Sequence, residues 1–218
     1  MTNQDSDGLF DGEGEERREL SWTEVDWEKY LSTHEEAVRE YLRHYDSLAA
    51  APDRIDEVAR RLGWEMEPEE DLTEDEIETV DAGFDAEWEP YTLHQNPVYI
   101  ATKALYTSLI ANWERIAAQP GRAPNALSLT FQGSLYRGRE NALQAVQALD
   151  LGDYALAICF FKRALREMND SLSRLTSESV AASTLLSRYR DFAQPRLFDL
   201  REIWLRVMSE CRSAQGDE

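Results

Sequence analysis

Residues 154–175, YALAICFFKRALREMNDSLSRL, carry the clearest structural pattern in the chain. Their large apolar residues recur at intervals of four and three, as on one face of an α-helix that packs against other helices. The positions of this stripe are Tyr154, Ile158, Phe161, Leu165, Met168, Leu172 and Leu175. The stretch therefore predicts a long amphipathic helix inside a helical core.

Similar stripes flank this helix and indicate three more helices, from residue 97 to about 119, from about 124 to 149 and from 177 to about 211. Asn96 is a good cap and Pro97 suits the first helical position, so a helix is predicted to start there. Asp153 is predicted to cap the helix over 154–175, and Ser177 to cap the last one. Pro195 lacks an amide hydrogen and is predicted to kink or split that last helix.

Two glycines interrupt the predicted helix over 124–149. Gly133 and Gly138 each cost about 1 kcal/mol relative to Ala in a helix interior. A bend or a close contact with a neighbouring helix is therefore expected near them.

No run alternates β-branched and polar residues with a period of two, so no sheet is predicted. The predicted fold class is all-α, with an antiparallel four-helix-bundle-like core over about 97–212. Extra N-terminal helices and an acidic linker are expected to accompany it. The predicted organisation is a disordered acidic tail (1–19), an acidic helical N-terminal region (20–95) and a helical bundle domain (96–213).

The negative charge of the protein is concentrated in its first part. The chain has 218 residues and a formal net charge of −20. Residues 1–95 hold 30 acidic and 8 basic side chains, a net charge of −22, whereas residues 96–218 hold 13 and 15, a net charge of +2. An electrostatic attraction between the two parts, within one chain or between copies, is therefore predicted.

The densest acidic tract, residues 65–89, has 13 acids and no Lys or Arg. One interpretation is a solvated, partly disordered linker. The other is an acidic ligand for a basic surface, because apolar residues punctuate the acids at intervals of 5, 3, 4 and 4 and would line one side of a docked helix. These apolar residues are Leu72, Ile77, Val80, Phe84 and Trp88. The candidate interaction surface comprises Glu69, Glu70, Glu74 and Trp88 on the tract and Arg163, Arg166 and Arg174 on the bundle.

Residues 152–165, GDYALAICFFKRAL, resemble the turn and second helix of a tetratricopeptide repeat. Ala157, Phe161 and Ala164 stand at the small, aromatic and small positions of that family, and Ala145 matches the small position of the first helix. Asn141 departs from the pattern, and no second copy occurs 34 residues away. The resemblance would imply a peptide-binding module, whereas a plain helical hairpin explains the same residues.

Most common catalytic signatures are absent from the sequence. There is no GxxxxGK[ST], GxGxxG or GxSxG motif, and the di-iron Glu-x-x-His pair is missing. The two Cys stand in no metal-binding motif, which favours core thiols in a reducing cytoplasm. These observations favour a protein without catalytic activity and predict no cofactor.

Four residues of the N-terminal region are the candidates if the protein is an enzyme or binds a metal: His34, Arg39, Glu40 and His44. His34 lies on an apolar stripe, which is more typical of a hydrogen-bonded core histidine than of a ligand. Glu40 and His44 are four residues apart and could share a metal or form a surface pair. Arg39 and His44 resemble the Arg-x4-His motif of HEPN ribonucleases, which would imply acid–base chemistry by His44 and charge stabilisation by Arg39.

The sequence as a whole favours a non-catalytic helical protein-interaction or regulatory protein. The predicted partner is a protein, either another protein or a second copy. No nucleic acid and no membrane partner is expected, because the N-terminal part repels phosphates and no apolar run reaches the ~18 residues of a spanning helix. The first residues are acidic and polar, so no secretory signal is expected and a cytoplasmic location is predicted. The alternative is a metal-binding or hydrolytic helical-bundle enzyme.

Overall fold

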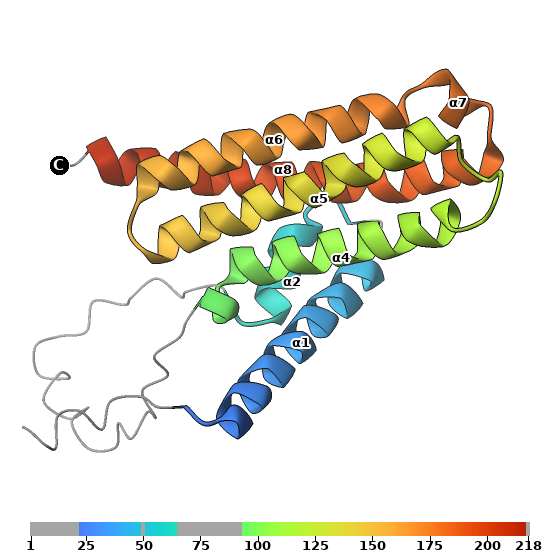
Figure 1. Ribbon diagram of the computed structural model, residues 1–218. Helices are drawn as coiled ribbons and strands as arrows, with labels where there is room; N and C mark the ends of the chain where they lie inside the picture. The colour runs from blue at the N-terminus through green and yellow to red at the C-terminus, as the bar shows by residue number, and fades with distance from the viewer. Residues whose placement is uncertain (1–21, 49–50, 65–92, 217–218) are drawn as a thin grey trace, which may run out of the picture. The chain divides into compact units, whose positions relative to one another are not determined.

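The computed structural model describes residues 22–48, 51–64 and 93–216 (Figure 1). Its elements are α1 (Glu24–Ser47), α2 (Arg54–Arg61), the 3-10 helix η1 (Leu93–Gln95), α4 (Pro97–Ala117), α5 (Asn125–Asp150), α6 (Tyr154–Leu175), α7 (Glu178–Ala181) and α8 (Thr184–Gly216). These residues contain no strand, so the all-α fold class is confirmed. The predicted tail over 1–19 and the acidic tract over 65–89 lie outside the described ranges.

Four long helices surround the main core. In the ring formed by α4, α5, α6 and α8, each helix packs against two others: α4 against α5, α5 against α6, α6 against α8, and α8 against α4. Figure 1 shows them side by side, with short connections from α4 to α5 and from α5 to α6. Short connections make successive helices antiparallel, and the interior of the ring is filled by the apolar stripes.

Two of the predicted helix starts have the expected cap geometry. The Asn96 side chain accepts hydrogen bonds from the amides of Val98 and Tyr99, with Pro97 at the start of α4. The Asp153 side chain accepts a hydrogen bond of 2.9 Å from the amide of Leu156 at the start of α6. Both side chains satisfy amides that have no partner within the helix.

The last long helix begins later than predicted, and it is not split. Ser177 precedes the short α7, and its side chain makes no capping hydrogen bond there. The long helix α8 begins at Thr184, where the Ser183 hydroxyl accepts a hydrogen bond from the amide of Leu186. Pro195 lies inside α8 without splitting it. Packing of the residues on either side of Pro195, Ala193 and Leu197, both fully buried, favours a continuous helix over a break.

Aromatic side chains from different helices meet in the core. The Trp113 ring of α4 lies 4.5 Å from Phe131 of α5 and 5.1 Å from Tyr189 of α8, measured between ring centroids. Further along, the indole of Trp204 donates a hydrogen bond of 3.1 Å to the Thr102 hydroxyl in the buried interior. These contacts join α4, α5 and α8 through large buried surfaces, each of which stabilises the fold by about 1.5–3 kcal/mol.

The pair α5 and α6 is held at short range by small residues. The hydroxyls of Ser134 and Ser171 are 2.7 Å apart and fully buried.

The pair α4 and α5 also makes a close contact. Gly138 faces Tyr106 of α4 so closely that a Cβ atom there would lie 2.5 Å from the Tyr106 hydroxyl oxygen. The close contact predicted near the two glycines is therefore found at Gly138. At Gly133 a Cβ would meet only the end of the Arg137 side chain.

The chain divides into two compact units, residues 1–33 and residues 34–218, with the boundary inside α1. In the first unit, Thr23 and Asp26 exchange hydrogen bonds at the start of α1. The rings of Trp22, Trp27 and Tyr30 lie edge to face, with centroids 4.7 to 6.0 Å apart. This small aromatic cluster orders the first turns of the helix locally.

In the second unit, the remaining part of α1 carries aromatic side chains that are buried together with α2. The Tyr41 ring stacks on Tyr45 at 6.1 Å and on Trp64, just beyond α2, at 5.8 Å. α2 is followed by its C-cap Leu62 and by Gly63, which has a positive φ of 69°. Glycine adopts this left-handed conformation without steric cost, so the chain can turn there toward Tyr41.

Candidate functional site

The outer side of α6 carries basic residues. Lys162, Arg163 and Arg166 are exposed, and none forms an ion pair with another residue in the described ranges. The Arg163 guanidinium lies over the Phe160 ring, 5.7 Å from its centroid. Arg174, which the sequence grouped with them, instead pairs with Asp170 at 3.6 Å and is only half-exposed. The positive charge of α6 available for binding is therefore concentrated on Lys162, Arg163 and Arg166.

The outer side of α8 exposes apolar side chains. Phe198 is 49% exposed and Leu205 is 41% exposed, large fractions for such residues in a helix that otherwise contributes to the core. The two are seven residues apart, which is about two helical turns, so they lie on one face. Arg201 lies between them, is exposed and forms no ion pair with any residue that the structure describes.

The geometry of the antiparallel pair brings these side chains to the same side. The rings of Phe161 on α6 and Trp204 on α8 face each other in the core at 6.1 Å. In an antiparallel pair, the residues that directly follow two facing core residues lie on the same side of the seam. Lys162 and Leu205 are such residues.

Other residues that directly follow core residues lie along the same side of the contact between α6 and α8, and together they define one surface. Each of its members directly follows a residue that packs in the core, namely Phe161, Leu165, Leu197, Leu200 and Trp204. We call this surface the α6/α8 outer face; its members are Lys162, Arg166, Phe198, Arg201 and Leu205. It combines three cations with two apolar side chains and contains no acid.

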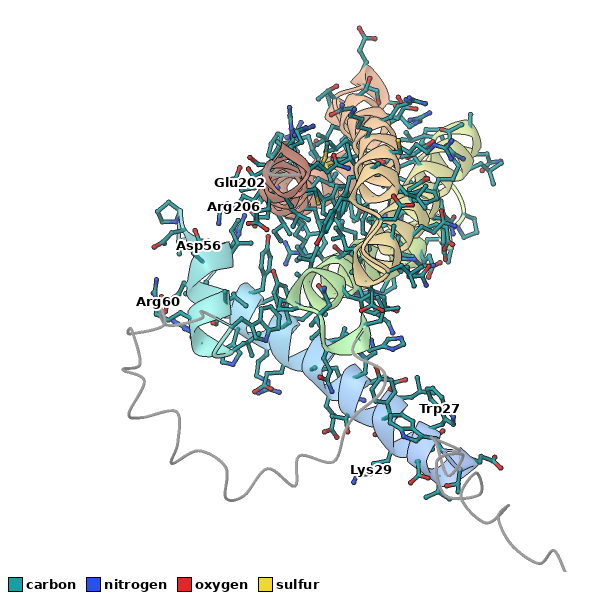
Figure 2. The ribbon with its side chains drawn as sticks, turned by 90° about the vertical axis from the view of Figure 1, so that its left-hand side faces the viewer. Trp27, Lys29, Asp56, Arg60, Glu202 and Arg206 are labelled. Carbon is teal, nitrogen blue, oxygen red and sulfur yellow. The ribbon has the colours of Figure 1, made fainter. Side chains whose placement is uncertain are left out.

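The opposite side of α8 shows what such arginines do when a partner is present. Arg206 forms an ion pair with Asp56 of α2 and a second one with Glu202 at 3.1 Å. Figure 2 shows Asp56 pointing from α2 toward Arg206, with Glu202 beside it. Arg196 donates a hydrogen bond of 2.5 Å to Asp46 of α1, and its guanidinium lies 3.7 Å from the centroid of the Phe192 ring. Acidic N-terminal helices thus cover this side.

A half-buried group on the same side strengthens that attachment. The Asp199 carboxylate accepts hydrogen bonds of 2.5 Å from the Tyr45 hydroxyl and from Arg54 Nε. The Arg54 guanidinium also lies over the Tyr45 ring, 4.8 Å from its centroid. Burial first, and then the hydrogen bond to Asp199, raise the pKa of Tyr45 above its ordinary value, so the phenol stays protonated as a donor.

His34 lies in a second polar cluster, away from α8. It is only 4% exposed. Its Nδ1 donates a hydrogen bond of 3.0 Å to the carbonyl oxygen of His94, and Lys103 Nζ donates one of 2.8 Å to its Nε2. Since a carbonyl can only accept, the proton of the neutral ring is on Nδ1. Burial and then the nearby Lys103 charge lower the pKa of His34 to about 4.

The other three candidates for catalysis lie on the surface of α1. Arg39 pairs with Glu35 at 3.2 Å, and both side chains are exposed. His44 Nε2 lies 3.9 Å from Glu40. Five residues along a helix correspond to a rotation of about 140°, so Arg39 and His44 lie on different sides of α1. The structure therefore does not bring Arg39 and His44 into one site within the chain.

The described ranges contain no group of three or more His, Cys, Asp or Glu side chains that could hold a metal ion. Glu69, Glu70, Glu74 and Trp88, the acidic members of the predicted interaction surface, lie outside these ranges. No helix in the described part of the chain is long and apolar enough to cross a membrane.

Several residues of these sites escaped sequence reasoning. Phe198 and Leu205 could have been noticed from the sequence, because they are large apolar residues that lie outside the apolar stripe of the last helix. Lys103 is one of three lysines and interrupts an apolar helix, which marks it as unusual. Asp199 and Tyr45 had none, because they meet across 154 positions of the chain.

Comparison of the chain with protein-family models, with curated proteins and with solved structures finds no match. The resemblance to a tetratricopeptide repeat therefore depends only on its own residues. Ala145, Ala157, Phe161 and Ala164 are all fully buried between helices. A repeat and a plain helical hairpin both require this burial, so it does not separate the two interpretations.

Proposed function

We propose that this is a non-catalytic protein-interaction protein whose α6/α8 outer face binds an acidic helical segment of a protein partner. The observation that supports it is the composition of that face: Lys162, Arg166 and Arg201 are exposed without an ion pair to any described residue, around the exposed Phe198 and Leu205. Cations attract an acidic segment, and the apolar side chains give it a surface to bury.

The energetic terms of such a complex are modest and complementary. Covering the exposed halves of Phe198 and Leu205 contributes about 1 kcal/mol each. The cations mainly accelerate the encounter and select acidic partners, and their effect weakens as salt screens the charges. The opposite side of α8 provides a precedent within the molecule, because Asp56 of α2 pairs there with Arg206.

A labelled acidic amphipathic peptide of unrelated sequence, with Leu at every third or fourth position among Glu residues, tests the proposal by fluorescence anisotropy. We expect the full chain to bind it at low ionic strength. The double variant Arg166→Glu/Arg201→Glu should bind at least about tenfold more weakly, which corresponds to about 1.4 kcal/mol.

The matched control is Arg122→Glu/Arg188→Glu, which changes the net charge equally at exposed arginines outside the face. It should bind within about twofold of the wild-type chain, because screening limits long-range effects. Equal losses in both double variants would show that only the overall charge matters. Absence of binding by the wild-type chain would reject the proposal.

The proposed location is the cytoplasm, supported by Cys159 and Cys211, which are both free thiols. Cys211 is buried as predicted, but the prediction of a core thiol is wrong for Cys159, which is exposed. The alternative function, a metal-binding or hydrolytic enzyme, draws on the buried contact between His34 and Lys103. Elemental analysis of the purified full chain tests the metal part. A ribonuclease assay that compares the wild-type chain with His44→Ala tests the hydrolytic part.

A further inference from the structure

We propose that the acidic segment bound by the α6/α8 outer face is residues 65–89 of a second copy of this chain. This inference rests on the proposed function and names the partner. It would make the protein a homodimer in which each copy inserts its acidic tract against the bundle of the other. The tract lies outside the described residues, so its part of the argument uses only its sequence.

The tract and the face are complementary in charge. Residues 65–89 contain 13 acids and no base. The face contains Lys162, Arg166 and Arg201 and no acid, and the neighbouring Glu202 and Asp170 are already paired with Arg206 and Arg174. Coulomb attraction therefore favours this tract, with a net charge of −13 over 25 residues, over the rest of the chain, with a net charge of −7 over 193 residues.

The apolar spacing also fits. Phe198 and Leu205 on the face are seven residues apart with Arg201 between them. Ile77 and Phe84 in the tract are also seven residues apart, with Asp81 between them. If the tract docks as a helix antiparallel to α8, Phe84 lies level with Phe198 and Ile77 with Leu205. Asp81 is then level with the Arg201 guanidinium.

A tract from the same chain could reach the face only with its link to η1 extended around the bundle, whereas a tract from a second copy carries no such restriction. Phe84, the residue of the matched pair nearest to Leu93, is joined to it by nine residue steps, which span at most about 32 Å when fully extended. Leu93 is buried in η1, which packs on α4 and α5, the edge of the ring opposite to α6 and α8. With helix axes 8–10 Å apart, a helix docked on the outer face lies about 20 Å from that edge through the bundle, and further around it.

In the simplest arrangement, the tract of each copy binds the α6/α8 outer face of the other copy, so that both tracts and both faces are bound. Two copies related by a two-fold axis would each contribute one tract and one face, so the same contacts would form twice. Doubling the contacts also raises the effective concentration of the second tract once the first is bound.

Sedimentation velocity of the full chain tests this exchange. The wild-type chain should be a dimer at about 50 mM salt and a monomer at about 0.5 M salt, since screening weakens charge pairs. The face variant Arg166→Glu/Arg201→Glu and a tract variant, Glu76→Lys/Asp81→Lys, should each be monomeric at low salt. An equimolar mixture of the two variants should restore dimers, because each variant then meets the complementary charge on the other.

The mixture separates the explanations. If the tract bound the face of its own chain, mixing the two variants would leave both monomeric. A chain that combines all four substitutions would also remain a monomer. Either result overturns the exchange. Variants that remain dimeric would also overturn it, by placing the interface elsewhere. A wild-type chain that is monomeric at low salt up to about 100 times the Kd of the acidic peptide rejects the second copy as partner, yet leaves the proposed function intact if that peptide binds. Circular dichroism melting verifies that each variant is folded.

Discussion

The two sides of α8 carry the same kinds of residues and have opposite surroundings. On one side, Arg196 and Arg206 pair with Asp46 of α1 and Asp56 of α2. On the other side, Arg201 is exposed between Phe198 and Leu205 without an ion pair to any residue of the described ranges. Arginines on a helix of this bundle therefore serve for attachment where an acidic helix covers them, and remain available where none does.

The difference also shows that acidic residues of the N-terminal part can pair with basic residues of α8. Its described helices, α1 and α2, already neutralise part of the basic bundle through Asp46 and Asp56. Charges distant in sequence thereby stabilise one unit, and the arginines of the covered side become part of the fold. The arginines of the α6/α8 outer face should contribute little to folding, which can be measured.

The largest effect is expected on the covered side, at Asp199. Its side chain is 18% exposed and that of its partner Arg54 is 12% exposed. Asp199→Ala removes a largely buried acceptor that Arg54 Nε and the Tyr45 hydroxyl share, so we expect a loss of about 3 kcal/mol in the free energy of unfolding. Urea unfolding followed by circular dichroism measures it. Glu202→Ala, one turn further along α8, is the control and should cost less than about 1 kcal/mol.

A second large effect should appear in the pH dependence of stability. The pKa of His34 is about 4 in the folded protein against 6.5 in an unfolded chain. Between these values the unfolded state binds the extra proton, so stability falls as the pH drops from 6.5 to 4, by up to about 3 kcal/mol.

His34→Gln isolates this contribution, because Gln still offers an acceptor to Lys103 and has no proton to bind in this range. Lys103, His94 and Glu35 are the charged or titratable groups around His34, and they remain in the variant. The difference in stability between the two proteins should therefore shrink as the pH falls toward 4. A constant difference across this range would contradict the assignment.

A smaller effect is expected at Asp56, whose ion pair with Arg206 is about half exposed on both sides. Asp56→Asn should lower the free energy of unfolding by less than about 1 kcal/mol, because solvent screens such a pair. Thermal melting at low salt measures the effect, which should diminish at high salt. Asp53→Asn, three residues earlier and without a capping hydrogen bond, serves as the control.

The smallest effect on stability is expected on the outer face. Arg201→Glu should change the free energy of unfolding by no more than about 0.5 kcal/mol, since it breaks no contact in the described structure. A loss as large as that of Asp199→Ala would show that Arg201 belongs to the fold, and would remove the distinction between the two sides of α8. Urea unfolding of the two variants in parallel makes this comparison.

The bundle could be predicted from the sequence because its signals are local. The stripe over 154–175, the Asn96-Pro97 pair and the cap at Asp153 each lie within a few residues of the structure they determine. The error at Ser177 has the same origin, because a good capping residue does not state how long the following helix is. α7 ends after one turn, and Ser183 caps the helix that continues.

The attachment of the N-terminal helices could not be predicted, because its contacts are far apart in sequence. Asp46 meets Arg196, and Asp56 meets Arg206, in both cases 150 positions away. Nothing near Asp56 distinguishes it from the other acids of the N-terminal region. The position of His34 on an apolar stripe indicated a buried, hydrogen-bonded histidine, but Lys103 as its donor became visible only in three dimensions.

The close approach of Gly138 to Tyr106 has a consequence for how far this chain can vary. Any side chain at residue 138 would have to displace a fully buried tyrosine, so only glycine fits there at the present spacing of α4 and α5. The close spacing of α4 and α5 thus requires a residue without a Cβ atom at position 138. Because α6 packs on α5 and α8 on α6, the alignment of the seam that exposes Phe198 and Leu205 depends on it.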